Sequence, residues 1–180
     1  MNDPFLTLSD LEDHVWDRLA QGAANADDPF RFVTLATMGQ DGPEARTVGL
    51  RRADRAASEV EVHSDLRTAK VRALAVDPRA TILLWDAATQ VQVRLRVTLR
   101  LVASDPIRWA RVPPLARLNY GTDPAPGTPV DMPEVVTRTP DVARFCALVG
   151  RVHAMDALSL AHDPHRRARF ADGQRHWIAP

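Results

Sequence analysis

The alternation of apolar and polar residues is strongest between residues 90 and 102. Every odd position from Val91 to Leu101 carries a branched aliphatic side chain, and every even position between them carries Gln, Arg or Thr. Because successive side chains of a strand point to opposite faces, this pattern predicts a long strand with one buried and one polar face. Its length favours a curved sheet or a barrel over a small flat sheet.

Shorter patterns of this kind predict further strands. Segments rich in β-branched residues flank a Gly/Asp/Pro break, which indicates a β-hairpin. Val60 and Val62 alternate with glutamates and indicate a third strand. The predicted strands lie at 31–38, 45–52, 59–64, 79–86, 142–158, 166–172 and 175–179.

Helical spacing is seen in a few segments. Residues 8–20 place Leu11, Val15, Trp16 and Leu19 on one face, with Ser9 as the expected N-cap. A second helix is expected to open near residue 68 and to stop at Pro78, and residues 105–121 are expected to be helical. Residues 122–140 form a proline-rich loop, which is typical of a lid, a partner contact or simple disorder. We therefore expect one mainly β (α+β) domain over residues 1–180, an antiparallel barrel with helices outside.

Composition narrows the class of protein. The chain is 45% hydrophobic and 26% charged, with a formal net charge of zero, so it has no global attraction to nucleic acid or to an acidic membrane. Cys146 is the single cysteine, which excludes an intrachain disulfide and favours a reduced, cytoplasmic setting. The N-terminal segment is acidic and lacks a long apolar run, so we expect no signal peptide or membrane span.

Lys70 is the only lysine among 23 basic residues. It lies in or near the first turn of the helix that follows the third strand, where free backbone N–H groups and the helix dipole favour an anion. Ser64 and Thr68 can supply hydroxyl donors to the same anion. A compact ammonium can fit where a planar guanidinium cannot. The alternative is a solvated surface lysine.

Arginines and one glutamine form the other candidates. Arg46 and Arg51 are five residues apart, so an ideal strand places them on opposite faces, and only an extended ligand could meet both. Gln92 on the long strand could meet the edge of a heterocycle with alternating donors and acceptors. The alternative is that all three face water.

The segment 162–170, HDPHRRARF, is the densest basic cluster. His165, Arg167 and Arg169 could bind a phosphate or carboxylate, or could form a basic surface tip. His162 and His165 lack the further ligands that a metal site needs, so no metal is expected. Glycine-rich phosphate loops and nucleophile elbows are also missing from the sequence.

The ordered set of these motifs resembles the pyridoxamine 5'-phosphate oxidase-like family of FMN-binding split barrels. The set comprises R-x-V-x-L-R at 46–51, H-S-x(3)-T-x-K at 63–70, the long strand with Gln92, and RRARF at 166–170. The resemblance implies a six-stranded antiparallel split barrel and a homodimer with FMN at the subunit interface. The implied FMN-binding residues are Arg46, Thr47, Val48, Gly49, Leu50, Arg51, His63, Ser64, Thr68, Lys70, Gln92 and Arg169.

The chain departs from the oxidase pattern near the substrate. Ala69 replaces an arginine, Arg51 replaces a lysine, and Ser159 replaces a tryptophan. We take Arg117, His165 and Arg167 as candidates for binding a small anionic substrate, and we assign no catalytic residue. The expected function is an FMN-dependent oxidoreductase; the alternatives are an NAD(P)H-dependent flavin reductase, a non-catalytic flavin-binding protein, and a haem-binding barrel with His162 or His165 as axial ligand.

Overall fold

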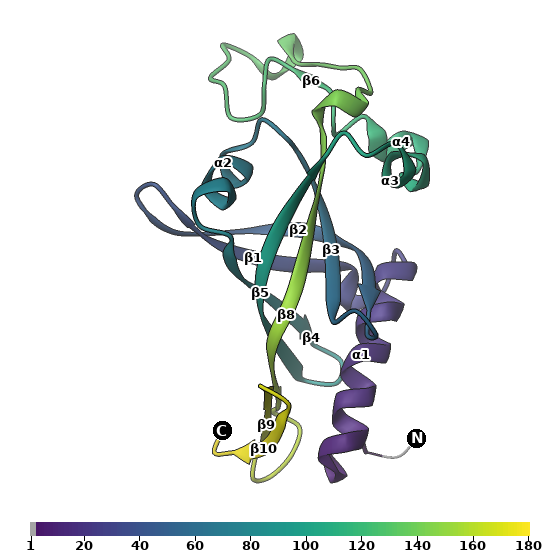
Figure 1. Cartoon of the computed structure of the whole chain (residues 1–180), viewed down its shortest axis with the longest axis vertical. Coiled ribbons are helices and arrows are strands. Elements are labelled where there is room, and N and C mark those ends of the chain that lie inside the picture. The colour runs from purple at the N-terminus through teal and green to yellow at the C-terminus, as the bar shows by residue number, and fades with distance from the viewer. Residues whose placement is uncertain (1–2) are drawn as a thin grey trace.

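The sheet of the computed structural model, which describes residues 3–180, closes on itself (Figure 1). Within those residues it has eight antiparallel strands: β1 (Phe32–Gly39), β2 (Gly42–Asp54), β3 (Glu59–Asp65), β4 (Arg79–Asp86), β5 (Val91–Ala103), β8 (Phe145–Ser159), β9 (Arg166–Ala171) and β10 (Gln174–Ile178). Six of them form a barrel in the order β8–β3–β2–β1–β4–β5, closed by pairing of β5 with β8. Strand β9 pairs with the second half of β8, on the side away from β5, and β10 pairs with β9, so these two strands extend the sheet beyond the barrel. The predicted mainly β split barrel is confirmed.

The long strand β5 confirms the alternating pattern of the sequence. Its odd positions from Val91 to Leu99 are buried in the barrel core, and Leu101 is half-buried at the end. The even positions, Gln92 to Arg100, stay partly or fully exposed. The strand is held on both sides, by β4 along its first half and by β8 along its whole length. It therefore forms the seam at which the barrel closes.

Helix α1 (Leu8–Ala24) packs along the outside of the barrel against β2. The four residues predicted to share its buried face, Leu11, Val15, Trp16 and Leu19, are all buried. The predicted N-cap was wrong. The Thr7 hydroxyl accepts a hydrogen bond from the Asp10 N–H at 3.1 Å, so the cap lies two residues before Ser9, while the helix begins at Leu8 as predicted.

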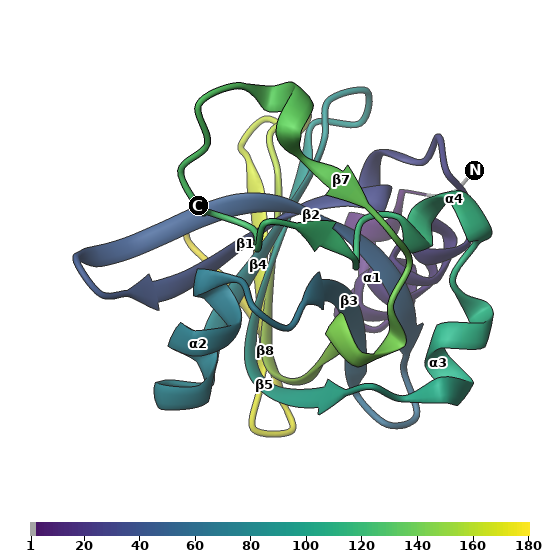
Figure 2. The ribbon, with the colours of Figure 1, turned by 90° about the horizontal axis from the view of Figure 1, so that it is seen from above.

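The remaining helices flank one end of the barrel. Helix α2 (Ala69–Val76) follows β3 and packs against β1 and β5, while α3 (Pro106–Arg111) and α4 (Pro114–Arg117) follow β5. Seen from that end, α2 lies on one side of the barrel and α3 and α4 on the other (Figure 2). The second helix thus opens where the sequence predicts, and the predicted helical region 105–121 consists of two short helices that begin at Pro106 and Pro114.

A proline-rich lobe, defined here as residues 121–139, covers the same end of the barrel between α2 and α3 (Figure 2). Its two arms pair as the short strands β6 (Thr122–Asp123) and β7 (Thr137–Arg138), and a 3₁₀ turn spans Pro133–Val135. The sequence predicts this segment only as a loop, because strands of two residues leave no periodic pattern.

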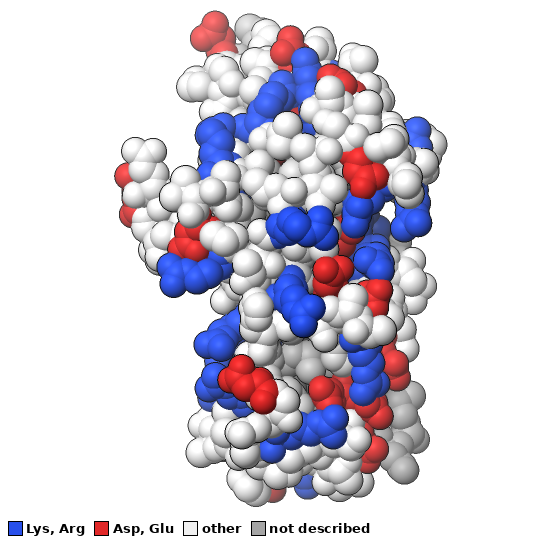
Figure 3. All heavy atoms as spheres, in the orientation of Figure 1, with Lys and Arg blue, Asp and Glu red and all other residues white. Residues whose placement is uncertain are grey.

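The surface carries charges of both signs. Basic and acidic side chains are interspersed over the face shown in Figure 3, in agreement with the balanced composition. None of the helices in residues 3–180 has the length and apolar character needed to cross a bilayer.

Candidate functional site

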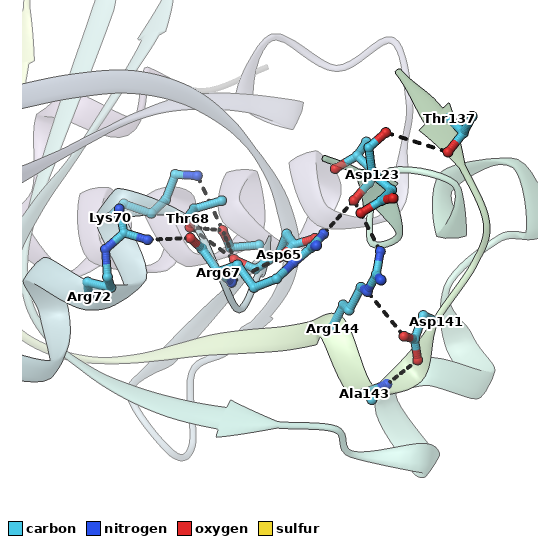
Figure 4. A network of polar contacts seen from close by, with 12 residues as sticks. Asp65, Arg67, Thr68, Lys70, Arg72, Asp123, Thr137, Asp141, Ala143 and Arg144 are labelled. Carbon is cyan, nitrogen blue, oxygen red and sulfur yellow. Dashed lines mark hydrogen bonds and ion pairs between the residues drawn. The ribbon is translucent and has the colours of Figure 1, made fainter. Parts of the chain in front are cut away.

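Three side chains predicted to bind an anion meet where β3 gives way to α2. The Lys70 ammonium donates to the Ser64 hydroxyl at 3.2 Å, and the Ser64 and Thr68 hydroxyls lie 3.0 Å apart (Figure 4). Thr68 occupies the N-cap position, but its hydroxyl donates to the Asp65 carbonyl instead of capping the helix. The first N–H groups of α2 therefore have no side-chain cap.

Arg46 reaches this corner from β2. Its guanidinium is held by the Thr37 hydroxyl at 2.7 Å, the Leu35 carbonyl and the carboxylate of Glu44. Burial lowers the pKa of Lys70, and the nearby positive charge of Arg46 lowers it further. Two cations are thus held beside each other and partly out of water, an arrangement that an anion between them would stabilise.

An open groove of about 500 Å³ lies over Arg46, Thr68 and Lys70, whereas Ser64 is buried and does not line it. Arg46, Lys70, Arg67 and Arg72 line it, together with residues 125–128 of the lobe. Arg67 and Arg72 flank Ala69, but the charge of Arg67 is already paired with the Asp65 carboxylate. Glu44 is the one carboxylate among the lining residues and pairs with Arg46, which leaves Lys70 and Arg72 without a carboxylate partner within residues 3–180, so the groove is suited to a phosphate.

A second cavity, of about 420 Å³, lies further along β2 and contains Arg51 and His63. The β2–β3 register shifts between Leu50 and Arg52, so Arg51 lies at a β-bulge. Arg46 and Arg51 line separate hollows, as their spacing predicts. The second cavity also contains basic residues that the sequence did not single out: Arg31, Arg52, Arg108 and Arg111.

Positive charges crowd each other in the second cavity. Arg31 donates to the Ala23 and Leu50 carbonyls, and burial together with the charge of Arg51 lowers its pKa. Burial raises the pKa of the Tyr120 phenol, while Arg51 beside it acts in the opposite direction. Among the described residues, neither Arg51 nor Arg111 forms an ion pair with a carboxylate. The cavity is therefore suited to an anionic molecule.

Glu61 is the one carboxylate lining the second cavity, and its charge is already compensated by hydrogen-bonded neighbours. It lies 2.8 Å from the His63 ring nitrogen Nε2 and accepts from Arg108 Nε at 3.0 Å. Burial raises the pKa of the Glu61 carboxyl, but the hydrogen bonds from His63 and Arg108 outweigh it and leave the pKa below 4.5. Arg108 belongs to α3, so this contact fastens α3 to the barrel wall.

The side chains of the predicted FMN-binding residues on β2 lie on two different faces of the strand. Val48 packs against the barrel core and Leu50 is fully buried, whereas the side chains of Thr47 and Arg51 point to the other side. Gly49 has no side chain, and a Cβ there would lie 2.9 Å from the Arg51 guanidinium. Only the backbone of Val48 and Leu50 is available to a ligand outside the barrel.

Gln92 and Arg169 lie at the opposite end of the barrel from Lys70. The Leu99 N–H donates to the Pro78 carbonyl just beyond α2. Gln92 lies seven residues before Leu99 on β5, so the two residues are roughly 23 Å apart at ~3.3 Å per residue. Arg169 is opposite Asp156 of β8, which is itself opposite Arg94 of β5. One chain therefore does not bring all predicted FMN-binding residues to one place.

Of the candidates for substrate binding, His165 and Arg167 line one surface hollow, whereas Arg117 lies apart from them on α4. The Arg117 guanidinium donates to the Val112 and Ala110 carbonyls and lies over the Trp109 ring. Arg167 forms an ion pair with Asp156 at 2.8 Å. His165 is exposed beside a surface hollow near Trp177.

His162 has a structural role in this chain. Its two ring nitrogens contact the Ser159 hydroxyl and the Asp3 carboxylate, at 2.7 and 2.9 Å. These contacts tie the start of the chain to the end of β8. Within residues 3–180, no group of three or more His, Cys, Asp or Glu side chains is placed to hold a metal ion.

The six-stranded antiparallel barrel closed by β5 and β8 is that of the split-barrel class of proteins. The sequence model of the pyridoxamine 5'-phosphate oxidase FMN-binding domain matches residues 13–103, and the chain belongs to this family. A search of curated protein sequences found no significant match.

Solved structures share the fold at low sequence identity. A pyridoxamine 5'-phosphate oxidase-related FMN-binding protein from Nostoc punctiforme is 24% identical over the full length of both chains, with a TM-score of 0.76. PhzG from Burkholderia lata, solved with tetrahydrophenazine-1-carboxylic acid, is 19% identical over 96% of this chain and 92% of its own, with a TM-score of 0.71. A Clostridium acetobutylicum protein related to general stress protein 26 is 11% identical over 93% and 92%, with a TM-score of 0.54.

Proposed function

We propose that this chain binds FMN and acts as an FMN-dependent oxidoreductase on a small anionic substrate. The observation that carries the proposal is the corner formed by Ser64, Thr68 and Lys70 with Arg46 beside it. Its hydroxyls, uncapped helix N–H groups and two partly buried cations match the oxygens and the charge of a phosphomonoester. Family membership supports FMN as the molecule that carries this phosphate.

FMN, when bound, supplies the two-electron redox chemistry, and the protein positions it. In this proposal the phosphate lies on Lys70 and Arg46, and the rest of the cofactor lies along the backbone of residues 47–50. The second cavity then adjoins the flavin end of the ligand. Arg51 holds a positive charge there, which favours a reduced, anionic flavin over the oxidised form.

The second cavity is the proposed place for the substrate. It has five guanidinium groups and one carboxylate, and Glu61 is already paired with His63 and Arg108. A substrate with a carboxylate or phosphate group would compensate the remaining charge of Arg51 and Arg111. PhzG, a structural neighbour, was solved with a carboxylic acid, which agrees with this chemistry. Arg117, His165 and Arg167 stay predictions.

A homodimer is proposed because one chain leaves Gln92 and Arg169 far from the groove. The outer face beside Gln92 also carries exposed aromatic side chains. Trp85 is opposite Gln92 in the β4–β5 pair and is 44% exposed, and Phe32 at the start of β1 is 64% exposed. A second copy that covers this face would bury both rings and bring the Gln92 end of one chain toward the groove of the other.

An absorbance spectrum of the purified protein tests the proposal directly. Flavin absorbance, and FMN identified after denaturation, would support it; a haem Soret band or a colourless protein that ignores added FMN would reject it. Loss of flavin absorbance with NAD(P)H under anaerobic conditions would identify a flavin reductase. Conversion of pyridoxamine 5'-phosphate to the aldehyde with release of peroxide would identify the oxidase, and a bound flavin that no donor reduces would indicate a carrier.

A further inference from the structure

The proline-rich lobe is closed at its base by a tight contact. The Thr139 N–H donates to the Gly121 carbonyl at 3.0 Å, and β6 pairs with β7 directly beyond it. A Cβ on Gly121 would lie 1.6 Å from the Thr139 carbonyl oxygen, so only glycine fits at this position. The lobe is thus a closed hairpin with a narrow neck.

Arg67 fastens this hairpin to the turn that precedes α2 (Figure 4). Its guanidinium makes two hydrogen bonds to the Asp65 carboxylate, at 3.0 and 2.7 Å, and donates to the Thr122 carbonyl at 2.7 Å. Arg144 donates to the same carbonyl at 3.1 Å. The Asp65 side chain is 2% exposed, and its hydrogen bonds raise the pKa of Arg67.

Because Asp65 neutralises the charge of Arg67, the guanidinium acts as a structural link and not as a free cation. It connects the turn 64–68 to the lobe, and these two segments form two parts of the groove. The turn 64–68 supplies Ser64 and Thr68 to the anion-binding corner, and residues 125–128 of the lobe form the opposite wall. A shift of the lobe therefore opens the groove, and a shift of the turn changes the corner.

We propose that Arg67 is a positioning residue that holds the lobe as the outer wall of the groove, so that docking of the lobe and binding of a phosphate-bearing ligand stabilise each other. This inference rests on the proposed function for the identity of the ligand, although not for its anionic character. Coupling of this kind is reciprocal: the lobe slows release of the anion, and the anion holds the lobe closed.

The first experiment compares FMN dissociation rates by recovery of flavin fluorescence on dilution. In one variant, residues 124–136 are replaced by Asn-Gly, a two-residue turn that joins the paired ends of β6 and β7. In another, Arg67→Lys keeps the charge beside Asp65 but cannot bridge Asp65 and Thr122. Both variants should release FMN at least about five-fold faster than the unaltered chain.

The chain contains a matched control for Arg67. Arg79 makes the same side-chain fork with an aspartate two positions earlier, Asp77, at 2.9 and 2.7 Å, but it lies at the start of β4 and does not line the groove. Arg79→Lys should leave FMN dissociation unchanged. Equal dissociation rates for the unaltered chain, Arg67→Lys and the shortened lobe would overturn the proposal.

A second measurement does not depend on FMN. Glu134 is exposed in the lobe, so a glutamate-specific protease should cut there when the lobe moves away from the barrel. Inorganic phosphate should slow this cleavage in the unaltered chain and in Arg79→Lys, but not in Arg67→Lys. If FMN does not bind and phosphate still protects Glu134, the proposed function fails and the coupling stands; cleavage that is insensitive to phosphate overturns the coupling.

Discussion

The Lys70 ammonium donates to the Ser64 hydroxyl at 3.2 Å, across the turn that joins β3 to α2. A lysine near a helix N-terminus is unfavourable for the helix dipole by a few tenths of a kcal/mol when it is exposed. Here it is also partly buried next to Arg46, which lowers its pKa. Glu44 already pairs with Arg46, and the charge of Asp65 acts to raise the pKa of Lys70. Under the proposed function, a bound phosphate beside Lys70 and Arg46 would supply the further negative charge that favours an ammonium at this position.

Replacing Lys70 should therefore weaken FMN binding. Lys70→Ala removes one charge-assisted contact, and we expect a loss of about 1–3 kcal/mol in binding free energy, or roughly 5- to 150-fold in Kd. Titration of FMN fluorescence measures this directly. Lys70→Arg keeps the charge and should recover only part of the affinity, because a planar guanidinium replaces a compact ammonium. An unchanged Kd for Lys70→Ala would remove Lys70 from the site.

The affinity for FMN should also fall in alkaline solution. The pKa of Lys70 lies below 10.5 in the chain without ligand, and a phosphate beside it would raise that pKa. The complex then binds more protons than the free protein in the interval between the two values, so affinity decreases as pH rises through the lower one. It should also decrease below about pH 6, where the phosphate loses its second charge.

The Lys70→Arg variant is the control for this pH profile. An arginine stays protonated throughout the accessible range, so the alkaline decrease should disappear while the acidic decrease remains. Titrations of both proteins between pH 5 and about 10.5 decide the matter. An alkaline decrease of equal size in the two proteins would show that a group other than Lys70 titrates.

Much of the fold could be predicted from period-two patterns. The buried face of β5 and the position of β4 follow from alternation and from β-branched residues, because a half-buried strand demands that pattern. The start of α1 at Leu8 was predicted, but its N-cap was placed two residues late, at Ser9 instead of Thr7, since several hydroxyl and carboxyl residues there could cap a helix. The pairing of β6 with β7 depends on the contact between Gly121 and Thr139, which are distant in sequence, so no local sequence pattern predicts these two strands.

The proximity of Ser64, Thr68 and Lys70 could be predicted because the three residues are close in sequence. Ser64, Thr68 and Lys70 lie within one turn and one helix start, so local geometry alone brings them together. Arg108 and Arg111 of the second cavity were missed, because α3 reaches the outer face of β3 only through the closure of the barrel. A hint was present in α3 and α4, where three arginines recur within residues 108–117 of the sequence.

Removal of the Glu61 charge should destabilise the fold at neutral pH. Glu61→Gln loses the ionic character of hydrogen bonds to His63 and Arg108, and we expect the free energy of unfolding to fall by about 1.5–3 kcal/mol. Urea denaturation followed by circular dichroism measures this. Because the folded pKa of Glu61 lies below 4.5, its contribution is complete above that pH and is lost as pH falls through the folded value.

Glu59→Gln is the control on the same strand. The Glu59 carboxylate is more exposed and lies 3.9 Å from Arg52, so its loss should cost less than about 1 kcal/mol. The difference between the unaltered chain and Glu61→Gln should shrink in acid, whereas a difference that is constant from pH 7 to about pH 3 would contradict an ionic role for Glu61.

Disruption of the aromatic face beside Gln92 should separate the proposed dimer and release flavin together. Trp85→Glu or Phe32→Glu would place a carboxylate in a buried interface, which is unfavourable because the charge has no partner there. Leu115→Glu on α4 changes an even more exposed apolar residue, 83% exposed, and serves as the matched control. Sedimentation velocity gives the mass, and absorbance in the same run gives the bound flavin. We expect monomers without flavin for the first two variants and an unaltered flavin-bound dimer for the third. A flavin-loaded monomer of any variant would show that one chain suffices for the cofactor, and Gln92 and Arg169 would then have no part in the site.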